Sequence, residues 1–301
     1  MSRHLHEARL YEAIENSFGE KPCRLKSVGG GCINQAFVGE LKGGLRIFIK
    51  TRFDAGPQTF EIEADGLRWL REGIAATPSN PLCVPKVLKV LSDPPALVLE
   101  AFEALPHPPT PLSEEALGRG IALLHRSLPP HSTFGYHIAN DLGPLRLNNE
   151  PSPSWAEFYA DRRLLPLFEL LTKKRPLLHT TRSAFERLLD RLPDLLGPEE
   201  PPSRLHGDLW SGNVAYDSRG RPYIFDPAVF AGNREVDLAM MQLFGGFSPR
   251  VFAAYDEVFP RAYGHKERLP IYQLLPLIVH AILFGGGYVQ DVVRIIMRFG
   301  G

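Results

Sequence analysis

A proline-rich segment at residues 103–111 constrains the fold of this chain more than any other feature. Four of its nine residues are prolines, and each proline fixes the backbone and removes a hydrogen-bond donor. The segment cannot continue a helix or a central strand, so it is typical of a boundary between structural units. The pattern before it is strand-like and the pattern after it is helical. This predicts an α+β chain with two lobes, residues 1–102 and residues 103–301.

The first lobe has the pattern of an antiparallel sheet with one main helix. Residues 45–50, the third expected strand, are almost continuously apolar or β-branched, as buried strands are. Apolar spacing predicts helices at 7–18 and 59–72. Strands are expected within 27–50, around a glycine-rich turn and a second turn at 42–44, and at 87–91 and 96–100.

The second lobe has mostly helical spacing. Ser113 is placed to cap its first helix, with two glutamates in the first turn. Residues 129–153 have no regular pattern and predict a long loop, which in compact domains is often functional. Helices are expected at 113–128, 154–171, 180–195, 234–243, 249–259, 269–284 and 287–299.

Composition excludes several classes of protein. The 301 residues include 34 basic and 34 acidic side chains, and this balance argues against a nucleic-acid partner, whose binding rests on neutralising phosphates. Three cysteines at these spacings match neither a disulfide framework nor a zinc motif. The N-terminus lacks the apolar region of a signal peptide, and the apolar stretch 269–284 is too short for a membrane span. We expect a cytoplasmic protein with no membrane partner.

The run Leu-His-Gly-Asp-Leu-Trp-Ser-Gly-Asn at 205–213 carries the strongest chemical signal. Asp208 and Asn213 stand as in the D-L-x-x-x-N part of the protein-kinase catalytic loop. Asp226 follows Asn213 by 13 residues, after an apolar run that predicts a short hairpin. Asp208 is predicted to orient an attacking hydroxyl for phosphoryl transfer from ATP, and Asn213 and Asp226 to be oxygen ligands of Mg²⁺. The alternative is that Asp208 and Asn213 only tie a turn together.

Two features of the first lobe complete this arrangement. Gly29, Gly30 and Gly31, followed by Cys32, form a turn between strands whose backbone N–H groups are predicted to approach ATP phosphates. An ordinary turn is the alternative for the glycines, and a small packing residue for Cys32. Lys50 ends an apolar strand and needs a partner if buried.

Glu63 is the predicted partner of Lys50. It shares a helix face with Leu67 and Leu70, so it should point inward, where an unpaired carboxylate is costly. We predict a Lys50–Glu63 ion pair, with Lys50 contacting the α- and β-phosphates of ATP.

The strand at 96–100 leads directly into the proline-rich boundary. The backbone of this hinge, from Glu100 to Phe102, is predicted to contact the adenine edge. A plain edge strand is the alternative.

Four further residues have open interpretations. Asp237 either caps a helix or holds the backbone of the catalytic loop. Trp210 either stacks on a sugar or packs within the protein. His206 is expected to brace the loop by a hydrogen bond, and His125 to be a satisfied core histidine.

Together these motifs closely resemble the fructosamine kinase (ketosamine-3-kinase) family. The resemblance rests on Gly-Gly-Gly-Cys-Ile-Asn at 29–34, Phe-Ile-Lys ending at Lys50, the loop at 205–213 and Leu-Phe-Gly-Gly-Phe at 243–247. It implies the protein-kinase-like fold of the aminoglycoside phosphotransferases. It also implies ATP-dependent phosphorylation of the 3-hydroxyl of ribulosamines, erythrulosamines or fructosamines, free or protein-bound. The phosphorylated adduct then falls apart and frees the amine, which is a deglycation repair.

The resemblance also assigns residue roles. It implies that Trp210 lines the sugar site, that His280 borders the acceptor, and that Cys32 is a candidate for redox control through intermolecular disulfides. The sequence is compatible with a monomer or a homodimer. Two segments depart from the family pattern. Ile282 stands where an asparagine is common, and Leu147 begins a run that is commonly Gln-x-Asn. Both segments border the acceptor by analogy, so the identity of the acceptor stays open.

Two rival functions follow from the same residues. One is a small-molecule kinase of the same fold that acts on another alcohol, such as an aminoglycoside or choline. The other is a redox-responsive, nucleotide-binding pseudokinase. Its mark would be loss of Lys50, Asp208 or Asp226, and all three are present.

Overall fold

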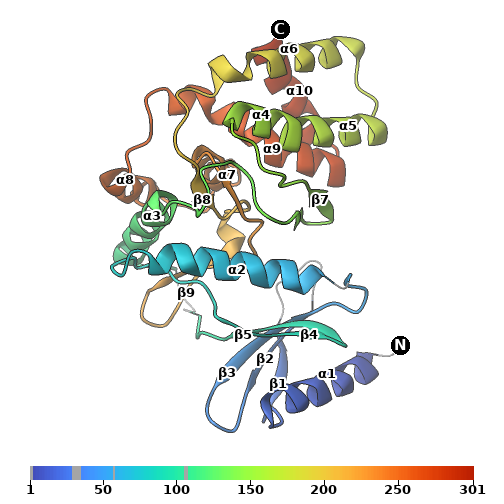
Figure 1. The fold of residues 1–301 in the computed structure, drawn as a ribbon, viewed down its shortest axis with the longest axis vertical. Helices are drawn as coiled ribbons and strands as arrows, with labels where there is room; N and C mark the ends of the chain where they lie inside the picture. The colour runs from blue at the N-terminus through green and yellow to red at the C-terminus, as the bar shows by residue number, and fades with distance from the viewer. Residues whose placement is uncertain (1–2, 29–34, 57, 105–107) are drawn as a thin grey trace.

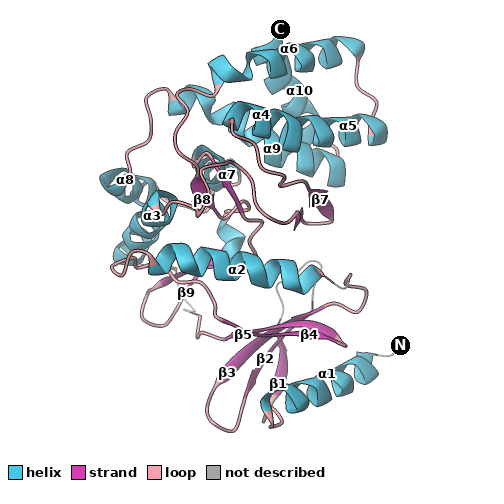
Figure 2. Cartoon of the chain, viewed as in Figure 1, coloured by secondary structure: helices cyan, strands magenta, loops and turns pink. Residues whose placement is uncertain are grey.

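The computed structural model describes residues 3–28, 35–56, 58–104 and 108–301, with side chains from residue 7 onward. The glycine-rich turn with Gly29, Gly30, Gly31 and Cys32 lies outside the described residues. The chain forms a sheet-containing part at the N-terminal end and a larger helical part at the C-terminal end (Figures 1 and 2). This is the α+β, two-part arrangement that the sequence predicts.

The N-terminal part is a five-stranded antiparallel sheet in the order β1-β2-β3-β5-β4. Its strands are β1 (Leu25–Val28), β2 (Gln35–Glu40), β3 (Arg46–Thr51), β4 (Val87–Ser92) and β5 (Pro95–Glu100). Its helices are α1 (Arg3–Phe18) and α2 (Thr59–Ala75). The predicted elements are confirmed, although α1 begins four residues earlier than its apolar spacing indicated.

Strand β3 faces two different environments because its side chains alternate. Ile47 and Ile49 are buried in a small cluster with Leu10 and Ile14 of α1. Lys50 has the opposite orientation and meets α2. The alternation therefore brings a buried cation to the inner face of the sheet.

The C-terminal part is built from helices and short strand pairs. Its helices are α3 (Pro111–Arg126), α4 (Trp155–Tyr159), α5 (Leu165–Lys174), α6 (His179–Leu195), α7 (Glu235–Leu243), α8 (Pro249–Val258), α9 (His265–Leu283) and α10 (Gly287–Gly300). Its strands are β6 (Asn140–Leu142), β7 (Leu145–Leu147), β8 (Ser203–Leu205), β9 (Val214–Tyr216), β10 (Pro222–Ile224) and β11 (Phe230–Gly232). They pair as β6–β7, β8–β11 and β9–β10. No helix in the described part of the chain is long and apolar enough to cross a membrane.

The start of α3 corrects one prediction. Thr110, not Ser113, is the N-cap: it has an extended backbone, and its hydroxyl accepts the Ser113 N–H at 3.2 Å. Pro111 then occupies the first helical turn, where its missing N–H costs nothing. The proline-rich boundary therefore starts the helix, and Ser113 lies buried within its first turn.

Two other predictions were wrong in detail. Residues 129–153 are not a plain loop, because β6 and β7 form a hairpin through Gly143, whose φ is +59°. Each strand has three residues, too few for a clear alternation. The helix expected at 154–171 is interrupted by a π-turn at residues 160–164 between α4 and α5.

Helix α2 packs into the core of the C-terminal part as well as against the sheet. Leu67 of α2, Leu97 of β5, Ile121 of α3 and Leu238 of α7 belong to one continuous buried cluster. Figure 1 shows α2 lying between the sheet and the helical part. The helix that carries Glu63 is therefore held from both sides.

Candidate active site

The pairing of β8 with β11 brings the two halves of the catalytic motif together. Between these strands the chain runs through His206–Asn213, the β9–β10 hairpin and Asp226. Ala228 N donates to His206 O at 2.9 Å, and Phe225 N donates to Asn213 O at 3.1 Å. The predicted hairpin therefore returns the second carboxylate beside the first.

Gly207 is required by the close return of this chain. Its φ is +81°, and a Cβ there would lie 2.0 Å from the carbonyl oxygen of Ala228. A side chain at this position would clash with the backbone, and the left-handed conformation also disfavours it. The glycine before Asp208 is thus a packing requirement of the loop.

Asp237 holds the backbone of the catalytic loop, which resolves the two roles the sequence left open. Its carboxylate accepts His206 N at 2.7 Å and Gly207 N at 2.9 Å. His125 Nε2 donates to the same carboxylate at 3.2 Å, and the Tyr255 hydroxyl lies 2.9 Å from His125 Nδ1. The predicted core histidine His125 is therefore satisfied, and it supports the anchor of the loop.

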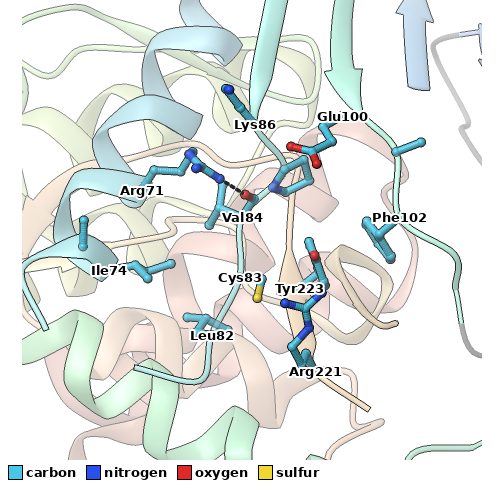
Figure 3. A pocket seen from close by; sticks show the side chains of 13 residues that line it. Arg71, Ile74, Leu82, Cys83, Val84, Lys86, Glu100, Phe102, Arg221 and Tyr223 are labelled. Atoms are coloured by element: carbon cyan, nitrogen blue, oxygen red, sulfur yellow. Dashed lines mark hydrogen bonds between the residues drawn. The ribbon is translucent and has the colours of Figure 1, made fainter. Parts of the chain in front are cut away.

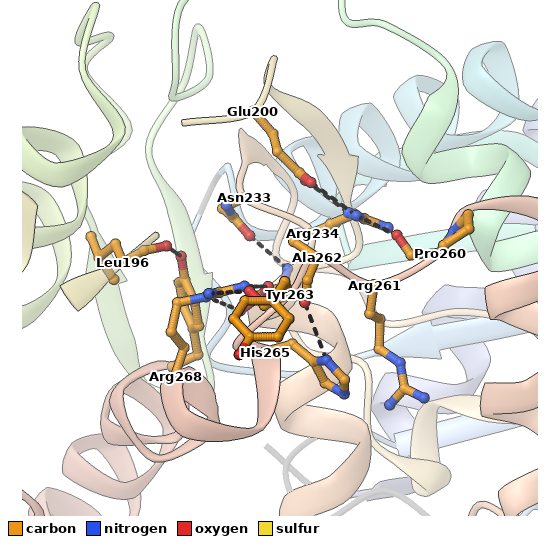
Figure 4. A network of polar contacts seen from close by, with 12 residues as sticks. Leu196, Glu200, Asn233, Arg234, Pro260, Arg261, Ala262, Tyr263, His265 and Arg268 are labelled. Atoms are coloured by element: carbon orange, nitrogen blue, oxygen red, sulfur yellow. Dashed lines mark hydrogen bonds and ion pairs between the residues drawn. The ribbon is translucent and has the colours of Figure 1, made fainter. Parts of the chain in front are cut away.

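A buried ionic network positions the start of α7, which carries Asp237 (Figure 4). The Arg234 guanidinium, 2% exposed, donates to Glu200 at 2.8 and 2.9 Å and to the carbonyls of Phe259 and Pro260. The adjacent Glu235 pairs with Arg268 at 2.6 Å. Buried charges need such paired partners, so this network fixes the helix start.

His206 braces the loop as predicted. Its Nε2–H donates to Phe225 O at 2.9 Å, so Nδ1 is the acceptor for Asp208 N at 3.3 Å. Burial lowers the pKa of His206, which keeps the ring neutral in this tautomer. The imidazole thus links Asp208 to the residue preceding Asp226.

Asp208, Asn213 and Asp226 converge at one point. Asn213 Nδ2 donates to Asp208 O at 2.8 Å and to Asp208 Oδ2 at 3.1 Å. It also lies 3.5 Å from Asp226 O. Because the amide nitrogen is committed to Asp208, the amide oxygen is the atom left for another ligand.

Lys50 joins the two lobes at this point. Its Nζ lies 2.9 Å from Glu63 Oε1 and 2.8 Å from Asp226 Oδ1. Burial lowers the pKa of Lys50, but the carboxylates of Glu63 and Asp226 outweigh it and the pKa is raised, so the ammonium stays charged. The predicted Lys50–Glu63 pair is confirmed, while the bond to Asp226 was not foreseen.

The Asp208 carboxyl has an unusual acidity. Burial raises its pKa, the hydrogen bond from Asn213 lowers it, and the Asp237 and Asp226 charges raise it, so that the pKa lies at about 7. A pKa near neutrality is typical of a carboxyl group that acts in catalysis.

The partly exposed Trp210 ring forms an aromatic surface at the catalytic loop. The Trp210 ring is 41% exposed and lies over Gly212, where a Cβ would be 2.2 Å from the indole. After α7, Gly246 packs so closely on Ser211 that a Cβ would lie 2.4 Å from its hydroxyl. The Leu-Phe-Gly-Gly-Phe segment therefore lies directly against the loop.

His280 lies in the same region, against Phe244 of that segment. The His280 and Phe244 ring centroids are 4.6 Å apart, and Tyr288 is 5.1 Å from His280. His280 Nδ1 lies 2.8 Å from Pro276 O, a carbonyl that only accepts, so Nδ1 carries a proton, and in the neutral ring Nε2 is an acceptor. Phe244 was not singled out from the sequence, although the segment that contains it was.

Both departures from the family pattern are buried. Leu147, at the end of β7, is 4% exposed. Ile282 is 2% exposed in α9. Both side chains belong to the main hydrophobic core.

The side chains of the hinge residues Glu100 and Phe102 lie apart from the group around Asp208. Glu100 and Phe102 line a cavity together with the end of α2 and β10 (Figure 3). Glu100 N donates to Lys86 O at 2.9 Å, and Ala101 N donates to Arg46 O at 3.0 Å. The predicted adenine contact concerned the backbone of this segment and stays a prediction.

Comparison with known proteins identifies the lineage. A model of the fructosamine kinase family matches residues 7–299. The chain belongs to the fructosamine kinase family. A relative in Enterococcus faecium named "probable ketoamine kinase" is 34% identical over 274 residues, covering 90% of this chain and 94% of that protein. The chloroplastic protein-ribulosamine 3-kinase of Oryza sativa subsp. indica is 33% identical over 277 residues, covering 90% and 77%.

Solved structures agree with this family and with the fold. A fructosamine-3-kinase homologue from Thermobifida fusca is 34% identical, with a TM-score of 0.85 over 96% of this chain and 98% of that chain. A choline kinase from Streptococcus pneumoniae, 16% identical, has a TM-score of 0.61 over 97% of this chain and 99% of the other chain, and shows the fold alone. This fructosamine kinase homologue therefore has the predicted protein-kinase-like fold and is an ATP-dependent phosphotransferase.

Proposed function

We propose that this protein transfers the γ-phosphoryl group of ATP to the 3-hydroxyl of a ketosamine. One observation carries the proposal: Lys50 and Glu63 from the sheet-containing part meet Asp226 beside Asp208 and Asn213. Five polar residues from two stretches of sequence, one in each lobe, form one site at the junction of the two lobes. The names of its relatives, ketoamine kinase and protein-ribulosamine 3-kinase, supply the substrate class.

The metal ligands proposed from the sequence fit Mg²⁺, which prefers oxygen donors. The Asp226 carboxylate is 45% exposed and close to Asn213, whose amide oxygen is the free end of its side chain. The backbone φ of Asp226 is 56°, which is unusual for a residue other than glycine and turns the chain at this position. When bound there, Mg²⁺ would neutralise charge on the ATP phosphates.

Asp208 is proposed to accept a hydrogen bond from the ketosamine 3-hydroxyl and to orient it toward the γ-phosphate. Phosphoryl transfer passes through a loose transition state, so orientation matters more than early deprotonation. Lys50, held by Glu63, is proposed to contact the α- and β-phosphates. Binding of Mg-ATP would then draw Lys50 and Asp226 onto phosphate and metal in place of their present contact.

The remaining site residues complete the proposal. Trp210 is proposed to stack on the sugar, and His280 to accept a hydrogen bond from the acceptor through Nε2. The backbone of Glu100 and Phe102 is proposed to contact adenine. Phosphate contacts of Gly29, Gly30, Gly31 and Cys32, and redox control by Cys32, remain predictions about residues outside the described part of the chain.

The biological setting stays a prediction. A kinase of ketosamines would serve deglycation, because the phosphorylated adduct releases its amine. We propose a cytoplasmic enzyme that acts on free or protein-bound ketosamines as a monomer or homodimer, without nucleic acid or membrane.

A coupled ATP-consumption assay tests the function. Ribulosamine, erythrulosamine and fructosamine derivatives of one amine would be compared with an aminoglycoside and choline, with the Asp208→Ala variant as control. We expect ketosamine-dependent ATP consumption and a product phosphorylated on O3, assigned by ³¹P–¹H NMR. Turnover only with the aminoglycoside or choline would favour the rival kinase.

A second readout separates catalysis from nucleotide binding. We expect Asp208→Ala to abolish turnover and to leave ATP affinity nearly unchanged, because the carboxylate is proposed to contact the acceptor hydroxyl. Turnover of this variant at the wild-type rate would contradict the assignment of Asp208.

A further inference from the structure

A cavity of about 330 Å³ lies at the joint between the two lobes, outside the site described above. Its walls come from the end of α2, residues 82–86, the hinge at 100–102 and the β9–β10 hairpin (Figure 3). None of Lys50, Asp208 and Asp226 lines it. Its volume is within the range of small-molecule sites.

The walls are held in place by contacts across the lobes. Cys83 N donates to Pro222 O at 2.8 Å, and Ile224 N donates to Cys83 O at 3.0 Å, so Cys83 pairs with β10. The Phe102 ring stacks on Tyr223 with centroids 4.0 Å apart and planes 15° apart. The cavity therefore has a preformed, partly aromatic wall and touches both lobes.

The lining is cationic. Arg71, Lys86 and Arg221 come from three separate segments, and Glu100 is the one carboxylate among the lining residues. Arg71 Nη1 donates to Val84 O at 2.7 Å, which holds the guanidinium at the wall and uses one of its five N–H donors. Arg221 is paired with Asp217 at 2.7 Å, so Arg71 and Lys86 supply the excess positive charge.

The pKa of the Cys83 thiol, which lines the cavity, is affected by this positive charge. Burial raises the pKa of Cys83, whereas the Arg221 and Arg71 charges act in the opposite direction. Both guanidinium groups therefore act on the interior of the cavity. Leu82 and the Phe102–Tyr223 pair provide apolar surface beside it.

We propose that this cavity binds a small organic anion, with its carboxylate or phosphate held by Arg71 and Lys86 and its apolar body on Leu82 and the Phe102–Tyr223 pair. Guanidinium groups bind planar oxyanions through paired N–H donors. The apolar wall adds free energy by removing surface from water. Because the lining combines cationic groups with apolar surface, we expect the ligand to need both an anionic head group and an apolar body.

The position of the cavity makes it a site that affects ATP binding. This step rests on the proposed function, in which the backbone of Glu100 and Phe102 contacts adenine. The side chains of the same two residues line the cavity. An occupant that shifts the hinge would change ATP affinity, and ATP would change the affinity of the occupant by the same factor.

Alkylation of Cys83 provides a site-specific test. In the unaltered protein, the rate of Cys83 alkylation by iodoacetamide, followed by peptide mass spectrometry so that Cys23 and Cys32 are measured separately, would be determined with 2-naphthoate, 2-naphthyl phosphate, the neutral 2-naphthalenemethanol or inorganic phosphate. We expect one or both aromatic anions to slow alkylation at least ~10-fold at saturation, and the other two compounds to have little effect. Protection by the one anion or the other identifies the head group. Equal protection by the neutral alcohol, or no protection by either anion, would overturn the proposal.

Charge variants give the matched control. Lys86→Gln, at an exposed position, and Arg71→Gln should each weaken anion protection about tenfold, as loss of one charged hydrogen bond does. Lys89→Gln, an equal charge change on β4 outside the cavity, should leave it unchanged. An equal effect of all three variants would point to general electrostatics and contradict a specific site.

The coupling is measured in the same assay with a non-hydrolysable ATP analogue. We expect the analogue to change the half-protecting concentration of the anion, and the anion to change analogue affinity by an equal factor. Independent binding would refute the coupling. Protection without ketosamine kinase activity would retain the cavity site and reject the proposed function, and activity without protection would do the reverse.

Discussion

At the scale of single residues, the Asp208 carboxyl has a pKa well above that of an ordinary aspartate. This carboxyl lies near two other carboxylates, Asp237 and Asp226. Burial and their charges raise its pKa, and the hydrogen bond from Asn213 Nδ2 lowers it. Such a group holds its proton to about pH 7 in the folded enzyme but loses it near its ordinary pKa of about 4 when unfolded. Its ionisation therefore affects both catalysis and stability.

The first prediction is a pH profile. kcat/KM for Mg-ATP at fixed ketosamine should rise with pH and level off above the Asp208 pKa of about 7, because the reaction needs the ionised carboxylate to accept the hydrogen bond from the ketosamine 3-hydroxyl. At pH 6 it should be about a tenth of the plateau. A profile that is flat from pH 6 to 8 would show that Asp208 is already ionised in the free enzyme.

The sign of the stability effect is opposite. Between about pH 4 and 7 the unfolded state binds fewer protons at this residue than the folded state, so the Asp208 contribution to stability falls as pH rises. Asp208→Asn should therefore raise the melting temperature by at least about 2 °C at pH 8 relative to wild type. The difference should vanish near pH 4. Scanning calorimetry at both pH values measures it.

The second prediction concerns His280. His280→Phe keeps a ring against Phe244 and Tyr288 but removes the Nε2 acceptor. We expect KM for the ketosamine to rise about tenfold, the loss of roughly one hydrogen bond, with KM for ATP unchanged. The same change at exposed His131 is the control. Equal KM values for the ketosamine in wild type and His280→Phe would remove His280 from the acceptor site.

At the scale of elements, local pattern predicted most helices and strands and missed features set by neighbours. The spacing of Leu10 and Ile14 predicted α1, and the apolar run before Lys50 predicted β3. The β6–β7 hairpin is too short for a periodic signal, and its strands are defined by their pairing. The capping role passed from Ser113 to Thr110 because a proline at the first helical position shifts the start by three residues.

Helix crossings give the third prediction, since two buried helical glycines differ in the space around them. A Cβ at Gly118 of α3 would lie 2.1 Å from Val251 O of α8, whereas a Cβ at Gly66 of α2 meets only side-chain carbons at 3.4 Å or more. Gly118→Ala should destabilise by about 1–3 kcal/mol through forced separation of the helices. Gly66→Ala should be neutral or gain up to about 1 kcal/mol from helix propensity. Urea unfolding of both variants decides, and equal effects would contradict the close α3–α8 contact.

At the scale of the whole molecule, α2 belongs to the first lobe by sequence but is anchored to the second by its contacts. The Tyr136 hydroxyl donates to Asp65 Oδ2 at 2.5 Å. Trp69 packs against Tyr136 and beneath Arg204, whose Nη1 donates to Trp69 O at 3.0 Å. Because Asp65 lies two residues from Glu63 in α2, holding Asp65 in place also restrains Glu63, the partner of Lys50.

The fourth prediction tests this anchor. Tyr136→Phe removes a hydrogen bond to a charged group and should cost about 1.5–3 kcal/mol of stability. Unfolding should remain one transition, coincident by circular dichroism and tryptophan fluorescence, because the lobes share one core. Tyr263→Phe, at a fully exposed ring, should cost nothing measurable. Two separate transitions in wild type would show that the lobes unfold independently.

The sequence by itself determined the type of elements, the two-part organisation and the residues proposed for phosphoryl transfer. Periodicity and short motifs encode such features locally, and Asp208 and Asn213 lie on one short loop. Only the tertiary structure decided which distant groups meet: Asp226 on Lys50, Asp237 on the loop backbone, and the cationic lining of the hinge cavity. These contacts join residues 30 or more positions apart, or in the cavity three separate segments. Packing of whole elements, which no local pattern records, brings them together.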